Sequence, residues 1–251
     1  MAKIAGTQVT VGLGIESLAA PGVVVAESVF IPWTSFSIQA VSEKSHFTSA
    51  RGIRNRSSDS MIRRKYSQGS IGFVPTAKIM PYALILAMGS VSSSGVSDSA
   101  YTHTFSVQNT GTSFRTATVT SRHGGVEIPQ FTNMVCNSLN FEVSDDYAAA
   151  TLELIGQFPG TDTVTESYAT ETQFAYHQMT VKFGTSFSVA AGNSATPLKG
   201  FKLNLNNNIL LDEAFLSGSN GITSSNLIPG RLVMTGSYSL HFSDTVELAK
   251  Y

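Results

Sequence analysis

The chain has 251 residues, of which 42% are hydrophobic and only 13% are charged, and its net charge is −1. This length fits one large all-β domain or two small ones, and the charged fraction compares with roughly 25% in soluble globular proteins. The composition argues against a freely diffusing monomer and favours a protein covered by partners, because hydroxyl and amide groups are buried in contacts at lower cost than ions.

Cysteine and hydropathy patterns narrow the class further. Cys136 is the only cysteine, which excludes an intramolecular disulfide and a cysteine-rich zinc site, and we expect it to be buried. No apolar stretch of signal-peptide length follows residues 1–6, and no apolar run approaches the roughly 18 residues of a membrane-spanning helix. We therefore expect the chain to fold in a cytosol and to stay soluble.

Residues 1–28 are interpreted as a flexible N-terminal arm. Within them, residues 11–15 read Val-Gly-Leu-Gly-Ile. This stretch lacks the third glycine, the following acidic residue and the strand–helix context of a dinucleotide-binding turn. It therefore predicts no nucleotide site.

Short segments with alternating apolar residues recur from residue 36 to residue 242, and turn-forming clusters separate them. Alternation places the apolar side chains of each segment on one face of a strand. The clearest examples are residues 101–107, 139–143, 152–154, 179–183, 201–205 and 238–242. The pattern predicts an all-β fold of mainly antiparallel sheets, a β-sandwich or half-barrel, with one or two short flanking α-helices.

Residues 42–68 form a basic segment between two predicted strands, and few of them are apolar. We expect a long loop, which without a core of its own is usually functional or flexible. It could bind nucleic acid, but aromatic residues for base stacking stand only at its edges. We favour contacts with acidic groups of a neighbouring copy. The candidate subunit-contact residues are Arg51, Arg54, Arg56, Arg63, Arg64 and Lys65.

Two places predict a helix. Pro81 stands at a helix start, residues 82–88 are largely apolar, and Gly89 follows as a C-terminal cap, which predicts a short buried helix. Ser243 and Asp244 could cap a second short helix that runs to the end of the sequence.

The two halves of the chain differ in charge. Residues 1–125 carry 11 Lys and Arg against 5 Asp and Glu, whereas residues 126–251 carry 5 against 12. Opposite charges favour head-to-tail contacts between copies, which form rings or filaments, although two unrelated surface biases remain an alternative.

The order of features in 36–73 recurs weakly in 201–242, which suggests a duplication. We therefore divide the chain into an arm (1–28), a first β unit with the basic loop (29–160) and an incomplete second β unit packed on the first (161–251).

Patterns for catalysis or ligand binding are weak. The five histidines are isolated, without the spacing of metal ligands, and the adjacent carboxylates at 145–146 and 212–213 lie in or beside predicted turns. We expect no enzymatic activity, no catalytic residues, no metal and no cofactor.

Over most of its length the chain resembles the major tail tube proteins of long-tailed, non-contractile bacteriophages, in the branch with a duplicated tube domain. The residues that carry the resemblance are Glu16, Pro21 and Gly22, the run Phe30-Ile31-Pro32-Trp33-Thr34-Ser35-Phe36, the stretch Arg51-Gly52-Ile53-Arg54, the strand at 66–73, the helix end at Met88-Gly89, Tyr101-Thr102-His103-Thr104-Phe105 and the strand pair at 136–143 and 150–156.

The resemblance implies a structural virion protein that assembles in the host cytoplasm. In that family hexameric rings stack into a helical tube, and viral DNA passes through the lumen during ejection without specific binding. The loop at 42–68 and the arm would bridge to neighbouring copies, and the implied partners include tail tip, terminator and tape measure proteins. Alternatives are another tail component, such as a tail terminator or a sheath-associated β protein, and a nucleic-acid-binding β protein.

Overall fold

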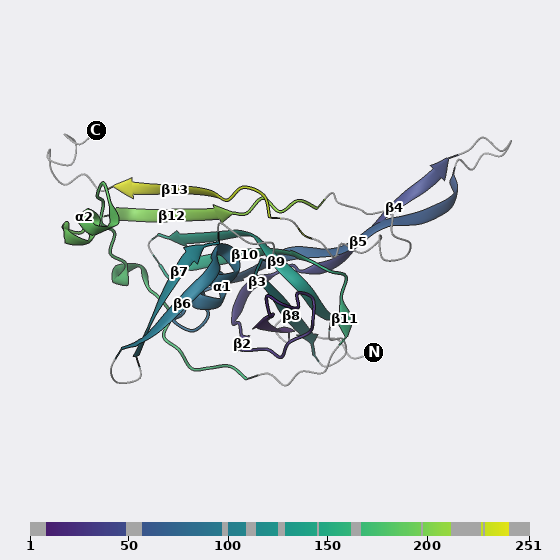
Figure 1. Ribbon diagram of the computed structural model, residues 1–251, viewed down its shortest axis with the longest axis horizontal. Helices are drawn as coiled ribbons and strands as arrows, with labels where there is room; N and C mark the ends of the chain where they lie inside the picture. Colours follow the sequence, from purple (N-terminus) through teal and green to yellow (C-terminus); the bar gives the residue numbers. More distant parts are fainter. Residues whose placement is uncertain are drawn as a thin grey trace.

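The structure is a computed structural model, and it describes residues 9–48, 57–96, 100–108, 114–124, 129–144, 146–161, 167–196, 198–211, 227 and 229–240. Within these residues, strands dominate and helices are few and short (Figure 1). The antiparallel main sheet curls into a half-barrel, so the predicted all-β fold is confirmed.

Within the described part of the chain the main sheet has 11 strands, and its continuous path runs β2-β1-β8-β9-β10-β5-β3. Those strands are β1 (Val9–Ile15), β2 (Val29–Phe30), β3 (Trp33–Phe36), β5 (Ser57–Phe73), β8 (Thr116–His123), β9 (Pro129–Val143) and β10 (Ala149–Gly156). Four more strands attach to this path, namely β4 (Gln39–Thr48) on β5, β11 (Gly160–Thr161) and β12 (Leu198–Asn206) on β9, and β13 (Val233–Leu240) on β12. The pairing of β12 with β9 joins the two predicted β units in one sheet.

Outside the main sheet, β6 (Gly89–Val96) and β7 (Ala100–Val107) form a separate two-stranded sheet. The 3₁₀ helix η2 (Tyr176–Gln178) and the helix α2 (Phe187–Gly192) lie between β11 and β12 in the chain. The side chain of Ser186 accepts a hydrogen bond from the Val189 N–H and caps the start of α2, a helix that the sequence did not predict.

The helix α1 (Met80–Met88) packs on the inner face of the half-barrel, and its predicted position is confirmed. Pro81 lies in its first turn, and Gly89 ends it in the left-handed conformation (φ 88°) with its N–H bonded to the Ile85 carbonyl. Leu86 is fully buried against the sheet. Cys136 is buried in the same core, as expected.

Residues 9–15 of the predicted flexible arm are instead strand β1, paired with β8 along its whole length. Val11 and Leu13 point into the core, whereas Gly12 and Gly14 lie under the segment 23–28, which crosses the opposite face. A Cβ atom on Gly14 would stand 2.5 Å from the Ala26 carbonyl oxygen. The two glycines therefore let the backbone of the segment 23–28 pass close to β1. This contact explains why glycines stand in the strand, and the local sequence does not reveal it.

We expect Gly14→Ala to destabilise the protein by about 2 kcal/mol, because the added methyl group must displace the backbone at Ala26. Gly160→Ala is a matched control, since a Cβ there meets nothing within 4 Å. Denaturant unfolding measures both variants, and equal stability of the two would show that the segment 23–28 moves aside freely.

Two further predictions are wrong in the structure. Within 42–68, residues 42–48 and 57–68 are not loop but belong to the paired strands β4 and β5, which need no apolar face because their backbones bond each other. Residues 179–183, predicted as a strand, form an irregular segment instead. The helix predicted after Ser243 lies outside the described residues.

Candidate assembly surfaces

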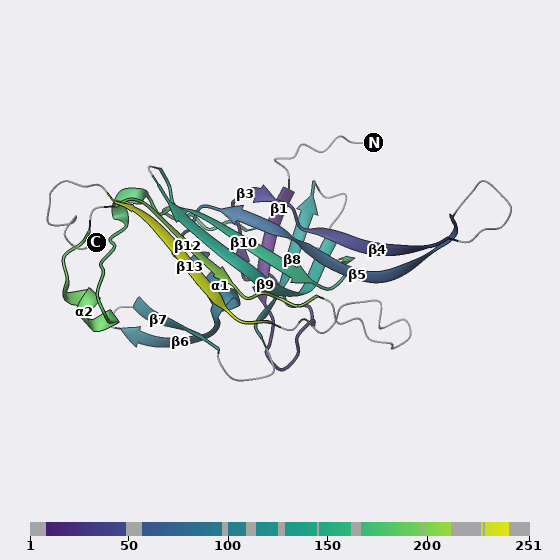
Figure 2. The same cartoon turned by 90° about the horizontal axis from the view of Figure 1, so that it is seen from above.

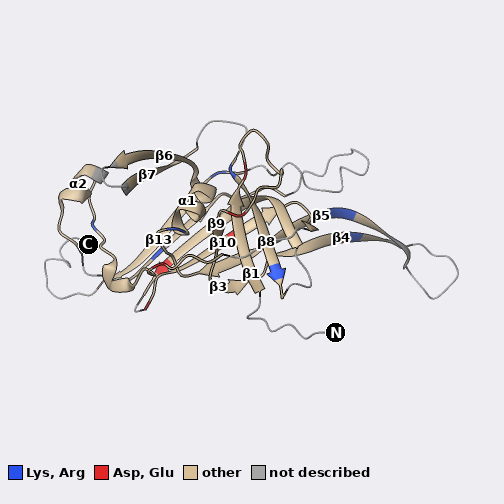
Figure 3. Ribbon diagram, turned by 90° about the horizontal axis from the view of Figure 1, so that it is seen from below, with Lys and Arg blue, Asp and Glu red and all other residues tan. Residues whose placement is uncertain are grey.

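The hairpin of β4 and β5 projects from one end of the molecule, far beyond the rest of the sheet (Figures 1 and 2). Figure 3 shows Lys and Arg on both of its strands. Met61, on β5, is 70% exposed, the highest exposure of any large hydrophobic residue in the described chain. An exposed apolar side chain on a projecting basic ribbon is typical of a contact surface.

The predicted contact residues divide into two groups. Arg51, Arg54 and Arg56 lie outside the described residues. Arg63, Arg64 and Lys65 are on β5, in three different environments.

Arg63 is the extra residue of a β-bulge, because Lys44 pairs with Ile62 while Glu43 pairs with Arg64. Its side chain is exposed. The Lys65 ammonium lies 5.1 Å from the centre of the Phe158 ring, a cation–π contact within the chain. Of the three described cations, Arg63 is the most exposed, whereas Arg64 and Lys65 are half-buried.

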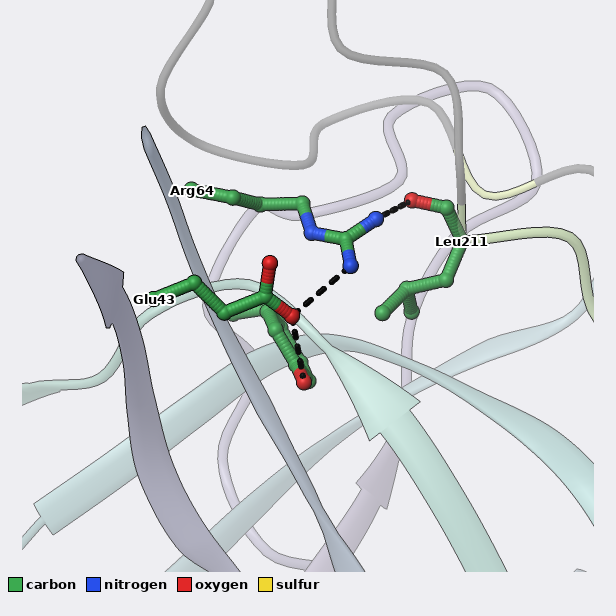
Figure 4. A network of polar contacts seen from close by, with 4 residues as sticks. Glu43, Arg64 and Leu211 are labelled. Carbon is green, nitrogen blue, oxygen red and sulfur yellow. Dashed lines mark hydrogen bonds and ion pairs between the residues drawn. The ribbon is translucent and has the colours of Figure 1, made fainter. Parts of the chain in front are cut away.

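Arg64 is tied into its own subunit (Figure 4). Its Nη2 donates to Glu43 Oε1 at 2.8 Å and its Nη1 donates to the Leu211 carbonyl at 2.5 Å. The guanidinium also lies 5.2 Å from the centre of the Tyr66 ring, and the side chain is only 12% exposed. Arg64 thus links the segment after β12 to the base of the β4–β5 hairpin and helps to hold the orientation of the hairpin relative to the main sheet.

The Arg64 guanidinium, with smaller contributions from the Tyr66 hydroxyl and Arg63, lowers the pKa of Glu43 below its usual 4.5. Because the pKa of Glu43 is lower in the folded protein than in the unfolded chain, its carboxylate stabilises the fold at pH values above the unfolded pKa. This stabilisation is lost as the pH falls through the folded pKa. We expect Arg64→Ala to lower the melting temperature at pH 7 by about 3 °C, with the difference from wild type shrinking at pH 3. Arg63→Ala is the control and should leave the melting temperature within about 1 °C. A deficit that stays constant with pH would contradict the ion pair.

A second surface lies on β13, at the edge of the sheet. In the described chain β13 pairs with β12 alone, so its other edge carries unpaired backbone groups. Its register places Met234 beside Leu205 of β12, and Tyr238 beside Phe201. Leu205 and Phe201 in turn lie beside Leu139 and Val143 of β9, so all six side chains are on the same face of the sheet. That face is core where β9 crosses it, yet Met234 is 54% and Tyr238 41% exposed. The core face therefore continues onto an edge strand that is only partly covered, since the Tyr238 ring lies 4.9 Å from the Phe183 ring while Met234 is more than half exposed.

The sequence model of one family, described as phage tail tube protein, matches residues 6–251. The chain belongs to the phage tail tube protein family. No curated protein matches the chain. Membership makes it a structural tail tube protein of the virion, in a family that assembles with itself and with other tail proteins. The resemblance of the sequence to phage tail tube proteins is thereby confirmed.

The described part of this tail tube subunit offers little for other chemistry. No three His, Cys, Asp or Glu side chains in it gather as metal ligands would. None of the helices described is long and apolar enough to cross a membrane.

One buried charge of the tail tube subunit was missed as a site by sequence reasoning. Glu16 is 1% exposed. Its Oε2 accepts hydrogen bonds from the Gly22 N–H and the Thr116 hydroxyl, both at 2.6 Å. Its Oε1 accepts from the Thr118 hydroxyl and the Asn133 N–H, both at 2.9 Å. The carboxylate thus joins the turn after β1 to β8 and β9, and four donors offset the loss of its hydration.

Proposed function

We propose that this chain is the tube subunit of a long-tailed, non-contractile phage, and that it assembles as stacked hexameric rings around a lumen. The lumen would carry viral DNA during ejection without specific binding. The observation that carries this proposal is β13, because an unpaired edge strand that bears exposed apolar residues is suited to pairing with another copy. Family membership supports the same reading.

The projecting hairpin supplies a second kind of contact in this proposal. Arg51, Arg54, Arg56, Arg63 and Lys65 would reach acidic groups on neighbouring copies, while Arg64 holds the hairpin in place from within. The exposed position of Arg63 and the projection of the hairpin away from the body support this role. The division into residues 1–28 and β units at 29–160 and 161–251 is part of the same proposal, except that residues 9–15 belong to the main sheet as β1.

Negative-stain electron microscopy of the purified chain, after concentration and prolonged standing, tests the assembly. We expect hollow tubes or rings with a central channel. If the chain remains monomeric both alone and with purified tail tip proteins as nucleator, the proposed function is wrong.

A further inference from the structure

A hollow of about 710 Å³ opens between the end of β9 and the segment 171–179. The segment is held in place by backbone hydrogen bonds, from Phe174 N–H to the Pro75 carbonyl and from Tyr176 N–H to the Asp146 carbonyl. The hollow is therefore a feature of the folded subunit and does not depend on loosely placed side chains.

The lining is mostly apolar, and it includes one carboxylate. Its apolar side chains include Phe141, Val143, Phe174 and Met179. Oε2 of Glu171 accepts the Lys78 N–H at 3.1 Å, and no hydrogen bond in the described residues involves Oε1. Aromatic and methionine side chains around an open hollow are typical of the centre of a protein–protein interface. The occupant that fits is an apolar side chain with a cation beside it.

The chain presents that combination at its other end. Val143, in the hollow, pairs with Phe201 near the start of β12, which follows α2 directly in the chain. In Figures 1 and 2, α2 and the start of β12 lie at the end of the long axis opposite the β4–β5 hairpin. The hairpin carries Met61, 70% exposed, and the exposed Arg63. Because the two surfaces lie at opposite ends of the long axis, they cannot meet within one copy.

We propose that the hollow receives the outer part of the β4–β5 hairpin of a second copy, with Met61 against the apolar lining and Arg63 beside Glu171. This inference rests on the proposed self-assembly and names its docking site. The contact joins two different surfaces of one chain, so it repeats head to tail along the long axis and leaves β13 free for a different neighbour.

Disulfide trapping tests the contact. Met61→Cys is mixed with Thr172→Cys, whose side chain lines the hollow, and the mixture is assembled and oxidised. Ser28→Cys, on the exposed segment over β1, replaces Thr172→Cys as control. Burial raises the pKa of the native Cys136 thiol and keeps it out of exchange. We expect about tenfold more covalent dimer with Thr172→Cys than with the control, because docking raises the effective concentration of the two thiols.

Charge reversal tests the ion pair in the same assay. Arg63→Glu beside Met61→Cys should lower the trapping rate on the order of tenfold, and Glu171→Lys on the receiving copy should restore it. Glu171→Gln separates charge from structure, since its amide oxygen still accepts the Lys78 N–H.

The outcomes are distinct. Tubes that form without the Met61–Thr172 cross-link, or with equal trapping at Ser28, overturn the docking site and leave the proposed function standing. Failure of the wild-type chain to assemble overturns the proposed function, and the docking site with it.

Discussion

The Glu16→Gln variant is expected to lose about 3 kcal/mol of stability. Each oxygen of the Glu16 carboxylate accepts one backbone N–H, from Gly22 at Oε2 and from Asn133 at Oε1. A glutamine places an NH₂ group at one of these positions whichever way its amide turns, so a donor faces a fixed donor. Threonine hydroxyls can rotate to adapt, but the backbone N–H groups cannot. For a chain of this size the loss corresponds to a fall in melting temperature of about 8 °C.

Glu27→Gln is the matched control for Glu16→Gln. Glu27 also accepts from a threonine of β8, at Thr120, but it is only half-buried and no backbone donor is bonded to its carboxylate in the described residues. Its amide can turn its oxygen to the hydroxyl, so we expect a loss below about 1 kcal/mol. Both variants are measured by thermal and urea unfolding. If Glu16→Gln is no less stable than Glu27→Gln, the Glu16 cluster does not stabilise the fold as described.

The double variant Met234→Lys/Tyr238→Lys is expected to reduce the yield of tubes at least tenfold. Burying one or two unpaired charges in a protein interface weakens binding by about this factor or more. Both side chains stand on the partly exposed face of β13, where the Tyr238 ring also contacts the Phe183 ring. Lysines on an edge strand block pairing with another sheet, because the ammonium groups would have to be desolvated in the contact. Both positions are partly exposed in the monomer, and the variant loses one ring contact, between Tyr238 and Phe183, so the melting temperature of the monomer should fall by no more than about 4 °C.

Val23→Lys is the control for charge alone, because Val23 is an exposed apolar residue outside β13. Tube yield is measured by sedimentation and electron microscopy of equal amounts of protein. Normal tubes from the β13 variant would remove β13 from the assembly interface. A loss of tubes with Val23→Lys as well would point to net charge as the cause.

Local patterns predicted the elements that depend on neighbours in the sequence. Pro81 and Gly89 bound α1 through their own backbone preferences, so the helix falls where the sequence places it. Alternation identified β9, β10 and β12, whose alternate residues pack on apolar neighbours, and also β7, although most of its side chains are exposed. At 179–183 the same alternation failed, because nothing in the described structure pairs with that segment as a strand.

The candidate surfaces were only partly predictable. The basic residues between 42 and 68 indicated a contact segment, but the hairpin and the inward turn of Arg64 arise from pairing between strands and from a carbonyl at Leu211, 147 residues away. Nothing in the sequence around Met234 or Glu171 marks the edge strand or the hollow. The edge strand depends on which strands lack a partner, and the hollow depends on where the segment 171–179 lies against the end of β9.

By itself the sequence determined the strand-rich class, α1, the buried Cys136 and the family, since each depends on residue type and short spacing. Only the tertiary structure decided that residues 9–15 are a central strand under a covering segment, and that Glu16 is a buried junction. The donors to Glu16 from Thr116, Thr118 and Asn133 lie 100 to 117 residues away. Contacts at such separations depend on how the whole sheet closes, and no local pattern records them.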